Sequence, residues 1–275
     1  MIRPIPKMTQ STIAREKINP MINDIRKPWW LLFSVFFIFS GMGIASPVWA
    51  GGSIDASLFA GLLEKYVTMG KVNYSGFKKE ESTLDAYLAI LEKVDPKSLP
   101  RNEQFAFYAN AYNAWTIKLI LSGYPGVQSI KDLGSLFKSP WKKKIARIDG
   151  EVMTLDHIEH DILRPRFKDP RVHFAINCAA KSCPPLSRTP FSGDKLDQQL
   201  DRLTRAFVND PNNNYLTDNT LYVSSIFKWF KSDFTDGIVD FFLKYSESDL
   251  NAKLRAIGND IKISYLDYDW SLNGK

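Results

Sequence analysis

The chain has 275 residues, of which 44% are hydrophobic and 13% aromatic, and this composition excludes an intrinsically disordered protein. Its formal net charge is +6, but residues 1–50 contribute six basic and two acidic side chains, so the rest carries only about +2. No basic stripe interleaved with aromatic residues follows, and nucleic-acid binding is therefore not expected.

The N-terminal segment 1–50 is expected to be a secretory signal. Arg26 and Lys27 precede a short apolar core, and small residues occupy the positions that a signal peptidase reads before a cut after Ala50. A start at Met21 would give a signal of more ordinary length. The alternative is an uncleaved membrane anchor, although the core is shorter than the ~20 residues of a spanning helix. After cleavage we expect a periplasmic or secreted protein without a stable membrane span.

The rest of the chain is expected to form an α+β fold, a helix-rich single domain with a buried central helix and a small, mostly antiparallel sheet. A helical part at 51–94 should pack with a globular domain at 95–275 as one unit. Helices are predicted at 55–68, 83–94, 103–122, 154–164, 194–208, 236–245 and 248–256. Extended segments are predicted in a hairpin at 142–153 and at 171–177, 220–224 and 261–267, with a loop at 178–186.

Local signals make some of these elements more specific. The hairpin should turn at Asp149-Gly150, and Thr154 should cap the helix that follows it. Ser82 should cap the second helix. The buried face of the first helix is expected to consist of Leu58, Leu62 and Tyr66.

The helix at 103–122 is apolar on nearly all sides and should be central. Asn110 and Asn113 lie three residues apart on one of its faces, and Glu103 extends that face by two turns. Buried amides must find partners. These side chains therefore either pin neighbouring loop backbone or belong to a site.

All three histidines and both cysteines fall between residues 157 and 183. A thiol nucleophile needs a base and a group that orients the base. The candidates for these catalytic roles are Cys178, Cys183, His173, His160, Asn110, Asn113, Glu103 and Glu159. Candidate binding residues are Ser182, Lys181 and Arg164.

Two other interpretations compete with the thiol nucleophile. An oxidising compartment favours a disulfide between Cys178 and Cys183. A zinc site is the third interpretation, but no pair of residues has a zinc-finger or HExxH spacing. No metal or other cofactor is therefore expected.

Five segments resemble, in the same order, the family catalogued as domain of unknown function 547. They are AFYANAYNAWTI, LDHIEHDILR, VHFAINCAAKSCPPL, IFKWFKSDF and YDWSLN. The chain is identified as similar to an exported bacterial member of that family, from about residue 95 to the C-terminus. The resemblance implies motif positions at Asn110, Asn113, Glu159, His160, Arg164, His173, Cys178, Ser182 and Cys183. It implies no settled activity, and fold alone does not give function.

Two functions are compatible with these residues. The first is a thiol-dependent hydrolase or acyltransferase of the cell envelope, with Cys178 preferred as nucleophile because it ends a predicted strand near Lys181. The alternative is a non-catalytic binding or scaffold module with a disulfide-shaped loop. The sequence shows no phosphate loop, dinucleotide fingerprint or nucleic-acid motif, so the substrate or envelope partner stays unknown at this stage.

Overall fold

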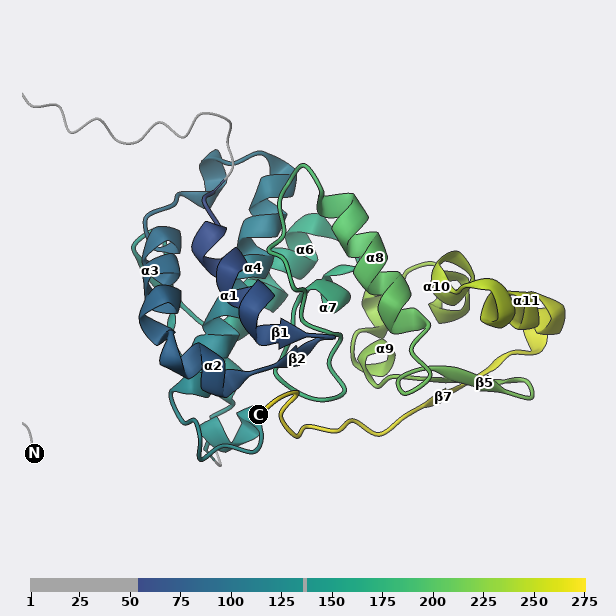
Figure 1. Cartoon of the computed structure of the whole chain (residues 1–275). Helices are drawn as coiled ribbons and strands as arrows, with labels where there is room; N and C mark the ends of the chain where they lie inside the picture. Colours follow the sequence, from purple (N-terminus) through teal and green to yellow (C-terminus); the bar gives the residue numbers. More distant parts are fainter. Residues whose placement is uncertain (1–53, 136–137) are drawn as a thin grey trace, which may run out of the picture. The chain divides into compact units, whose positions relative to one another are not determined.

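The computed structural model describes residues 54–135 and 138–275, where helices dominate over three small sheets (Figure 1). The α-helices are α1 (Ser57–Tyr66), α2 (Tyr74–Lys79), α3 (Glu81–Leu91), α4 (Arg101–Leu121), α5 (Leu155–His157), α6 (Arg164–Phe167), α7 (Val172–Ala175), α8 (Leu196–Val208), α9 (Ile226–Trp229), α10 (Ile238–Tyr245) and α11 (Ser248–Ile257). Short 3-10 turns are η1 (Pro96–Ser98), η2 (Ile130–Leu133), η3 (Pro140–Lys142), η5 (Lys231–Asp233) and η6 (Gly258–Asp260), and η4 (Ile158–Leu163) is a π-helical turn. The helix-rich α+β class predicted from the sequence is confirmed.

The strands are short and mostly antiparallel, as predicted. They are β1 (Val67–Thr68), β2 (Lys71–Val72), β3 (Ala146–Ile148), β4 (Glu151–Met153), β5 (Tyr215–Thr217), β6 (Thr220–Val223) and β7 (Lys262–Tyr265). β1 pairs with β2, β3 with β4, and β5 with β6, all antiparallel, while β6 and β7 are parallel. The expected signal segment, and its alternative as a membrane anchor, lie outside the described residues. Within 54–135 and 138–275 no helix combines the length and apolar character needed to cross a membrane.

Helix α4 is the central helix of the fold, as its apolar sequence predicts. Its first two residues and Lys118 reach solvent, and the other side chains are buried. Helices α2, α3 and α8 pack against it, and Lys118 forms an ion pair with Glu81 of α3 at 2.7 Å. A helix buried on all sides presents different faces to different parts of the fold. The side chains of Asn110, Tyr112 and Asn113 therefore form hydrogen bonds with different segments of the chain.

The segment after β7 runs back across the fold and ends beside β2 (Figure 1). The amide of Lys275 donates to the carbonyl of Val72 at 3.2 Å, and the carbonyl of Lys275 accepts from the amide of Tyr74 at 2.8 Å. The hydroxyl of Tyr74 donates to Asn273 Oδ1 at 2.7 Å, across 199 positions of sequence. These bonds fix the path of the C-terminal segment, which contributes two aromatic residues to the candidate site.

The hairpin and the helix cap that the sequence predicts next to the site are present. Asp149 and Gly150 both have positive φ, 52° and 72°, as a two-residue turn of this twist requires. The hydroxyl of Thr154 accepts from the amide of His157 at 2.9 Å and caps α5. Together they fix where the next helical segment starts.

The strand predicted at 171–177 is wrong, because Val172–Ala175 form the short helix α7. All four side chains of α7 are buried, and the helix packs against α8. A short apolar run fits a buried strand or a buried helical turn equally well. Tertiary packing decides here, and the carbonyl of Ala175 is bound by Asn113 Nδ2 at 2.9 Å as the helix ends.

Two predicted details of the N-terminal helices also need correction. Leu58 is 37% exposed, and the buried face of α1 consists of Phe59, Leu62 and Leu63. Helix α3 begins one residue before Ser82 and has no side-chain hydrogen bond at its N-cap. Periodicity therefore located both helices, but not the rotation of the first or the start of the second.

Candidate functional site

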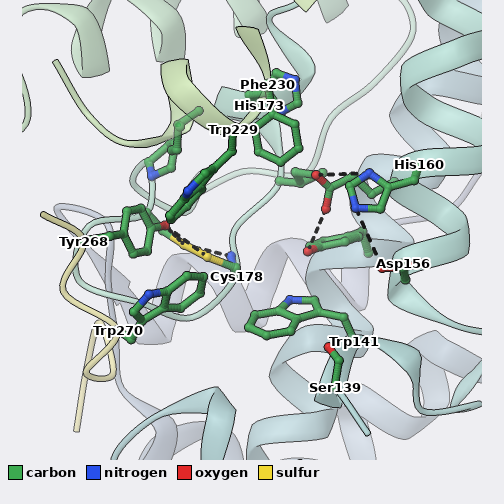
Figure 2. Close-up of a pocket in the computed structure, with 16 residues that line it drawn as sticks. Ser139, Trp141, Asp156, His160, His173, Cys178, Trp229, Phe230, Tyr268 and Trp270 are labelled. Atoms are coloured by element: carbon green, nitrogen blue, oxygen red, sulfur yellow. Dashed lines mark hydrogen bonds and ion pairs between the residues drawn. A yellow bond between two sulfur atoms is a disulfide. The ribbon is translucent and has the colours of Figure 1, made fainter. Parts of the chain in front are cut away.

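A pocket of about 210 Å³ opens between the helical segment α5–η4, the loop after α7, helix α9 and the C-terminal segment (Figure 2). One side, here called the aromatic wall, consists of Trp141, Trp229, Tyr268 and Trp270. The other side, here called the polar wall, consists of Asp156, Glu159 and His160. Figure 2 shows Trp229, Tyr268 and Trp270 across the cavity from His160 and Asp156, with Trp141 below Asp156.

The aromatic wall is a set of rings in mutual contact. The rings of Trp229 and Trp270 are nearly parallel, with centroids 5.6 Å apart and planes 23° apart. Tyr268 lies 4.8 Å from Trp229 and 4.5 Å from Trp270, while Trp141 meets Trp270 edge to face at 5.6 Å. Trp229 is nevertheless 46% exposed. Clustered aromatic surface that stays accessible beside a cavity indicates a binding site rather than a core.

Two residues of the polar wall, Glu159 and His160, lie on the π-helical turn η4, and Asp156 lies on α5 just before it. A π turn interrupts the regular i to i−4 bonding and often occurs at functional sites. Ile158 and Leu163 of this turn are fully buried in the core, while Glu159 and His160 line the pocket. The irregular turn thus places two titratable side chains next to each other on the pocket side.

The carboxyl group of Glu159 is buried at the pocket and accepts a hydrogen bond from Tyr112 Oη at 3.3 Å. Burial raises the pKa of Glu159 to about 7; Asp156 and Asp233 raise this pKa as well, while Arg164 lowers it. Near neutral pH the group therefore exchanges between a neutral proton donor and a charged acceptor.

Asp233 of η5 joins two residues that the sequence singled out. Its carboxylate accepts from Arg164 Nε at 2.6 Å and Nη2 at 2.9 Å, and it lies 2.8 Å from His173 Nε2. The bond to His173, together with those from Arg164, holds the pKa of Asp233 well below its usual range. His173 is 3% exposed and stacks on Phe230 at 4.0 Å, and burial lowers its pKa. The imidazole is thus fixed by a carboxylate and an aromatic ring.

His160 connects the polar wall to this network. Its Nδ1 lies 3.0 Å from Arg164 Nη1. Because a guanidinium can only donate, Nδ1 is the acceptor, and the neutral imidazole carries its proton on Nε2. Nε2 lies 3.8 Å from Asp156. Burial lowers the pKa of His160, which favours this neutral form.

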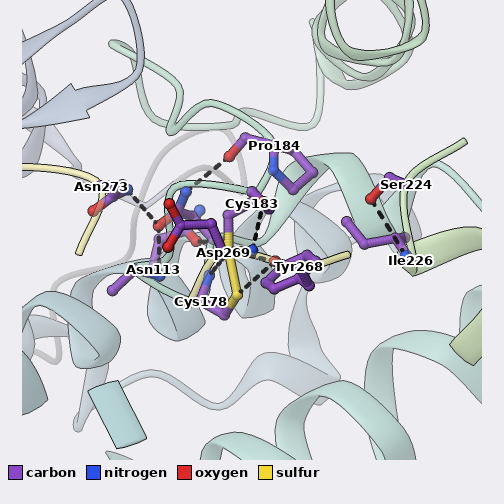
Figure 3. Close-up of a disulfide and its surroundings, with 12 residues drawn as sticks. Asn113, Cys178, Cys183, Pro184, Ser224, Ile226, Tyr268, Asp269 and Asn273 are labelled. Carbon is purple, nitrogen blue, oxygen red and sulfur yellow. Dashed lines mark hydrogen bonds between the residues drawn. A yellow bond between two sulfur atoms is a disulfide. The ribbon is translucent and has the colours of Figure 1, made fainter. Parts of the chain in front are cut away.

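Cys178 and Cys183 form a disulfide at the edge of the pocket (Figure 3). Tyr268 Oη lies 3.2 Å from each sulfur, and the amide of Cys178 donates to Cys183 Sγ at 3.0 Å. Within the described part of the chain, no imidazole is among the hydrogen-bonding partners of either sulfur. The cysteines are paired with each other and with a tyrosine, not with a histidine base.

Amide side chains hold the start of this disulfide loop (Figure 3). Asn113 Oδ1 accepts from the amide of Asn177 at 2.8 Å. Asn177 Oδ1 accepts from the amide of Ala179 at 2.9 Å and from Asn273 Nδ2 at 3.1 Å. Ala179 has a φ of 62°, which is uncommon for alanine. The central helix and the C-terminal segment therefore both fix the backbone next to Cys178.

Two other predicted residues of α4 lie away from the aromatic pocket. Asn110 Nδ2 donates to the carbonyl of Phe191, and Asn110 Oδ1 accepts from the amide of Phe191, each at 2.8 Å. Glu103 accepts from the amide of Gly193 at 2.6 Å. These are the bonds of side chains that pin loop backbone, so the structure places Glu103 and Asn110 at the loop before α8.

The three predicted binding residues do not line the pocket directly. Lys181 is exposed and forms an ion pair with Asp269 at 3.6 Å. Ser182 Oγ accepts from the amide of Asp269 at 2.9 Å. Arg164 supports the polar wall from behind, through Asp233 and His160. Lys181 and Ser182 thus attach the disulfide loop to the C-terminal segment.

The aromatic wall and Asp233 were not predicted from the sequence. A signal was available, because Trp229 and Asp233 lie in IFKWFKSDF, and Tyr268 and Trp270 lie in YDWSLN. Their positions beside residues that precede them by 60 to 90 positions could not be predicted from the sequence. In the described ranges no group of three or more His, Cys, Asp and Glu side chains has the geometry to hold a metal ion.

A family model described as "Protein of unknown function, DUF547" matches residues 96–208. Over this range the chain is similar to the DUF547 family. No curated protein and no solved structure matches the chain. The DUF547 match spans α4 to α8 and includes Trp141, the polar wall and both cysteines. Trp229, Tyr268 and Trp270 follow it, so the pocket is completed by residues outside the matched range. The family name carries no activity, and function must come from the site.

Proposed function

We propose that the chain binds a small ligand, or one unit of a larger one, in the aromatic-walled pocket, and that neither cysteine acts as a nucleophile. The contact of Tyr268 Oη with both disulfide sulfurs carries this proposal. Through this contact the disulfide forms part of the pocket surface, and the hydrogen-bonding partner of both sulfurs is a tyrosine hydroxyl. A disulfide sulfur has no thiolate to attack a substrate.

The surroundings of the disulfide support binding by a preformed site. The loop is closed covalently and held by Asn177, and the rings of the aromatic wall brace one another. A site that is rigid before its ligand arrives spends less binding energy on ordering. The proposed function is therefore that of a binding module with a disulfide-shaped loop.

The indole N–H signals of Trp141, Trp229 and Trp270 test the proposal by heteronuclear NMR. Each signal is assigned by the loss that a Trp→Phe variant causes. A panel of small fragments is then added, covering monosaccharides, aromatic acids and amines. We expect at least one fragment to shift these three signals and not that of Trp115, which is buried in α4. A panel that moves none of the three refutes the proposal.

A thiol-dependent hydrolase or acyltransferase is the second candidate function. It is favoured by one observation, that both cysteines line the same pocket as His160, His173 and Glu159. It requires reduction of the disulfide. Iodoacetamide labelling of the reduced protein near pH 6 tests it, since a catalytic thiolate reacts there and an ordinary thiol, with a pKa of about 8.5, does not. Slow labelling equal to that of glutathione removes this candidate.

We also propose that the chain is exported, as the N-terminal sequence predicts. The disulfide supports this, because disulfides persist in oxidising compartments. N-terminal sequencing of the protein from a periplasmic or secreted fraction should begin at Gly51. An N-terminus at Met1 or Met21 in that fraction would contradict cleavage.

A further inference from the structure

We propose that the aromatic pocket accepts one sugar ring of a glycan, stacked on Trp229 and hydrogen-bonded by the polar wall. This inference rests on the proposed function, that the pocket binds a ligand, and it names the class of that ligand. It follows from the chemistry of the two walls, from the cations already placed on the rings, and from the size of the cavity.

The pocket has one aromatic and one polar wall, and a sugar ring likewise has an apolar and a polar part. A pyranose has an apolar face of C–H groups and an edge of hydroxyl groups. Trp229, 46% exposed, offers a ring surface for the C–H face. Asp156 lies across the cavity from Trp229 (Figure 2), and Glu159 also lines the pocket, so two carboxyl groups offer oxygen atoms to the hydroxyl edge. An entirely apolar ligand would displace water from the half-exposed carboxylate of Asp156 without replacing its hydrogen bonds, which is costly.

The polar wall both donates and accepts hydrogen bonds, as hydroxyl groups require. Asp156 accepts, and the neutral His160 directs its Nε2 proton to the side of Asp156. Burial raises the pKa of Glu159 to about 7 although the hydrogen bond from Tyr112 lowers it, so the carboxyl group is partly protonated near neutral pH and can then donate. A ligand with hydroxyl groups satisfies donors and acceptors of this kind at once.

The chain's own cations already lie over two of the rings at the pocket, those of Trp270 and Phe230. Aromatic cages bind cations on the faces of their rings. Lys131 Nζ already lies over the ring of Trp270 at 3.9 Å, and the guanidinium of Arg164 lies over Phe230 at 4.9 Å. A second cation at these rings would meet an existing positive charge. A neutral ring stacked on Trp229 meets no such conflict.

The size of the cavity limits the ligand to about one ring. Its 210 Å³ is below the roughly 300–1,000 Å³ of pockets for drug-sized molecules. Any further units of a polymer must then run outside the cavity, past the exposed face of Trp229. A glycan chain with one unit inserted fits this arrangement.

Binding of cellotetraose, maltotetraose and chitotetraose tests the inference, by tryptophan fluorescence and by the indole signals of Trp141, Trp229 and Trp270. We expect at least one of the three to bind with a dissociation constant below about 1 mM. Trp229→Ala should weaken that binding by about threefold to tenfold, the value of one aromatic stacking contact. Trp229→Tyr should restore most of it, because a stacking ring is kept.

Tyr215→Ala is the matched control, since Tyr215 is 39% exposed on β5 and lies outside the pocket. It should bind the tetrasaccharide as the unchanged protein does. The inference is overturned if no tetrasaccharide binds, or if Trp229→Ala, shown to be folded by circular dichroism, binds equally well. Indole signals that respond to non-sugar fragments but not to any sugar would overturn this inference alone. Signals that respond to nothing would overturn the proposed function as well.

Discussion

Replacing Glu159 by glutamine should stabilise the protein above neutral pH. Burial raises the pKa of Glu159 from 4.5 to about 7, so the folded state keeps a proton that the unfolded chain releases. At about 1.36 kcal/mol per pKa unit, ionising the buried group costs about 3 kcal/mol of stability. Glutamine carries no charge, and its side-chain oxygen can still accept from Tyr112 Oη.

The sign of the pH dependence follows from the protons bound in each state. Between about pH 4.5 and 7 the folded state holds more protons at Glu159, so the free energy of unfolding falls as the pH rises. His160 and His173 act in the opposite direction, because burial lowers their pKa and the folded state binds fewer protons below about pH 6.5. Both histidines are present in wild type and variant, so the difference between the two proteins isolates the carboxyl group.

Urea unfolding followed by tryptophan fluorescence measures this difference. Near pH 5 the two proteins should have similar free energies of unfolding, and near pH 8 Glu159→Gln should be more stable by about 2–3 kcal/mol. Glu64→Gln, on the exposed side of α1, is the control and should change stability by less than about 0.5 kcal/mol at either pH. A difference between Glu159→Gln and wild type that is equal at both pH values would refute the reasoning.

Two further predictions concern the groups behind the pocket. Asn113→Ala leaves one buried amide and one buried carbonyl without partners, so it should lower the free energy of unfolding by about 2–4 kcal/mol. The exposed Asn212→Ala should cost under about 0.5 kcal/mol, and equal losses would mean that Asn113 is not a structural anchor. Asp233→Ala removes the partner of Arg164 and of a buried histidine and should cost about 3 kcal/mol. Asp249→Ala breaks an exposed ion pair and should cost under about 0.5 kcal/mol; a similar loss in both variants, measured by urea unfolding, would contradict this assignment.

The sequence predicted those parts of the fold whose signals are local. The burial of α4, the turn at Asp149-Gly150 and the cap at Thr154 each depend on residues a few positions apart, and the structure contains all three. The strand predicted at 171–177 failed for the opposite reason. Its apolar run is compatible with two structures, and contacts with α8 and with Asn113 select the helix.

The same distinction applies to the candidate site. Closeness in the sequence was enough to predict Glu159, His160, His173 and the two cysteines as one group. The structure places all five around one pocket. The aromatic wall comes from three separate segments, and no spacing rule connects them. Glu103, predicted for its place on the face of Asn110, serves instead to hold the loop before α8.

The path of the C-terminal segment has a consequence for how the protein is made. Tyr268 and Trp270 leave the ribosome after every element they touch, and the contact between Tyr74 and Asn273 must close a loop of 199 positions. Such distant contacts form late in folding. The polar wall and Trp141 can therefore be in place before the rest of the aromatic wall, and the chain gains a complete binding pocket only when its last segment has docked.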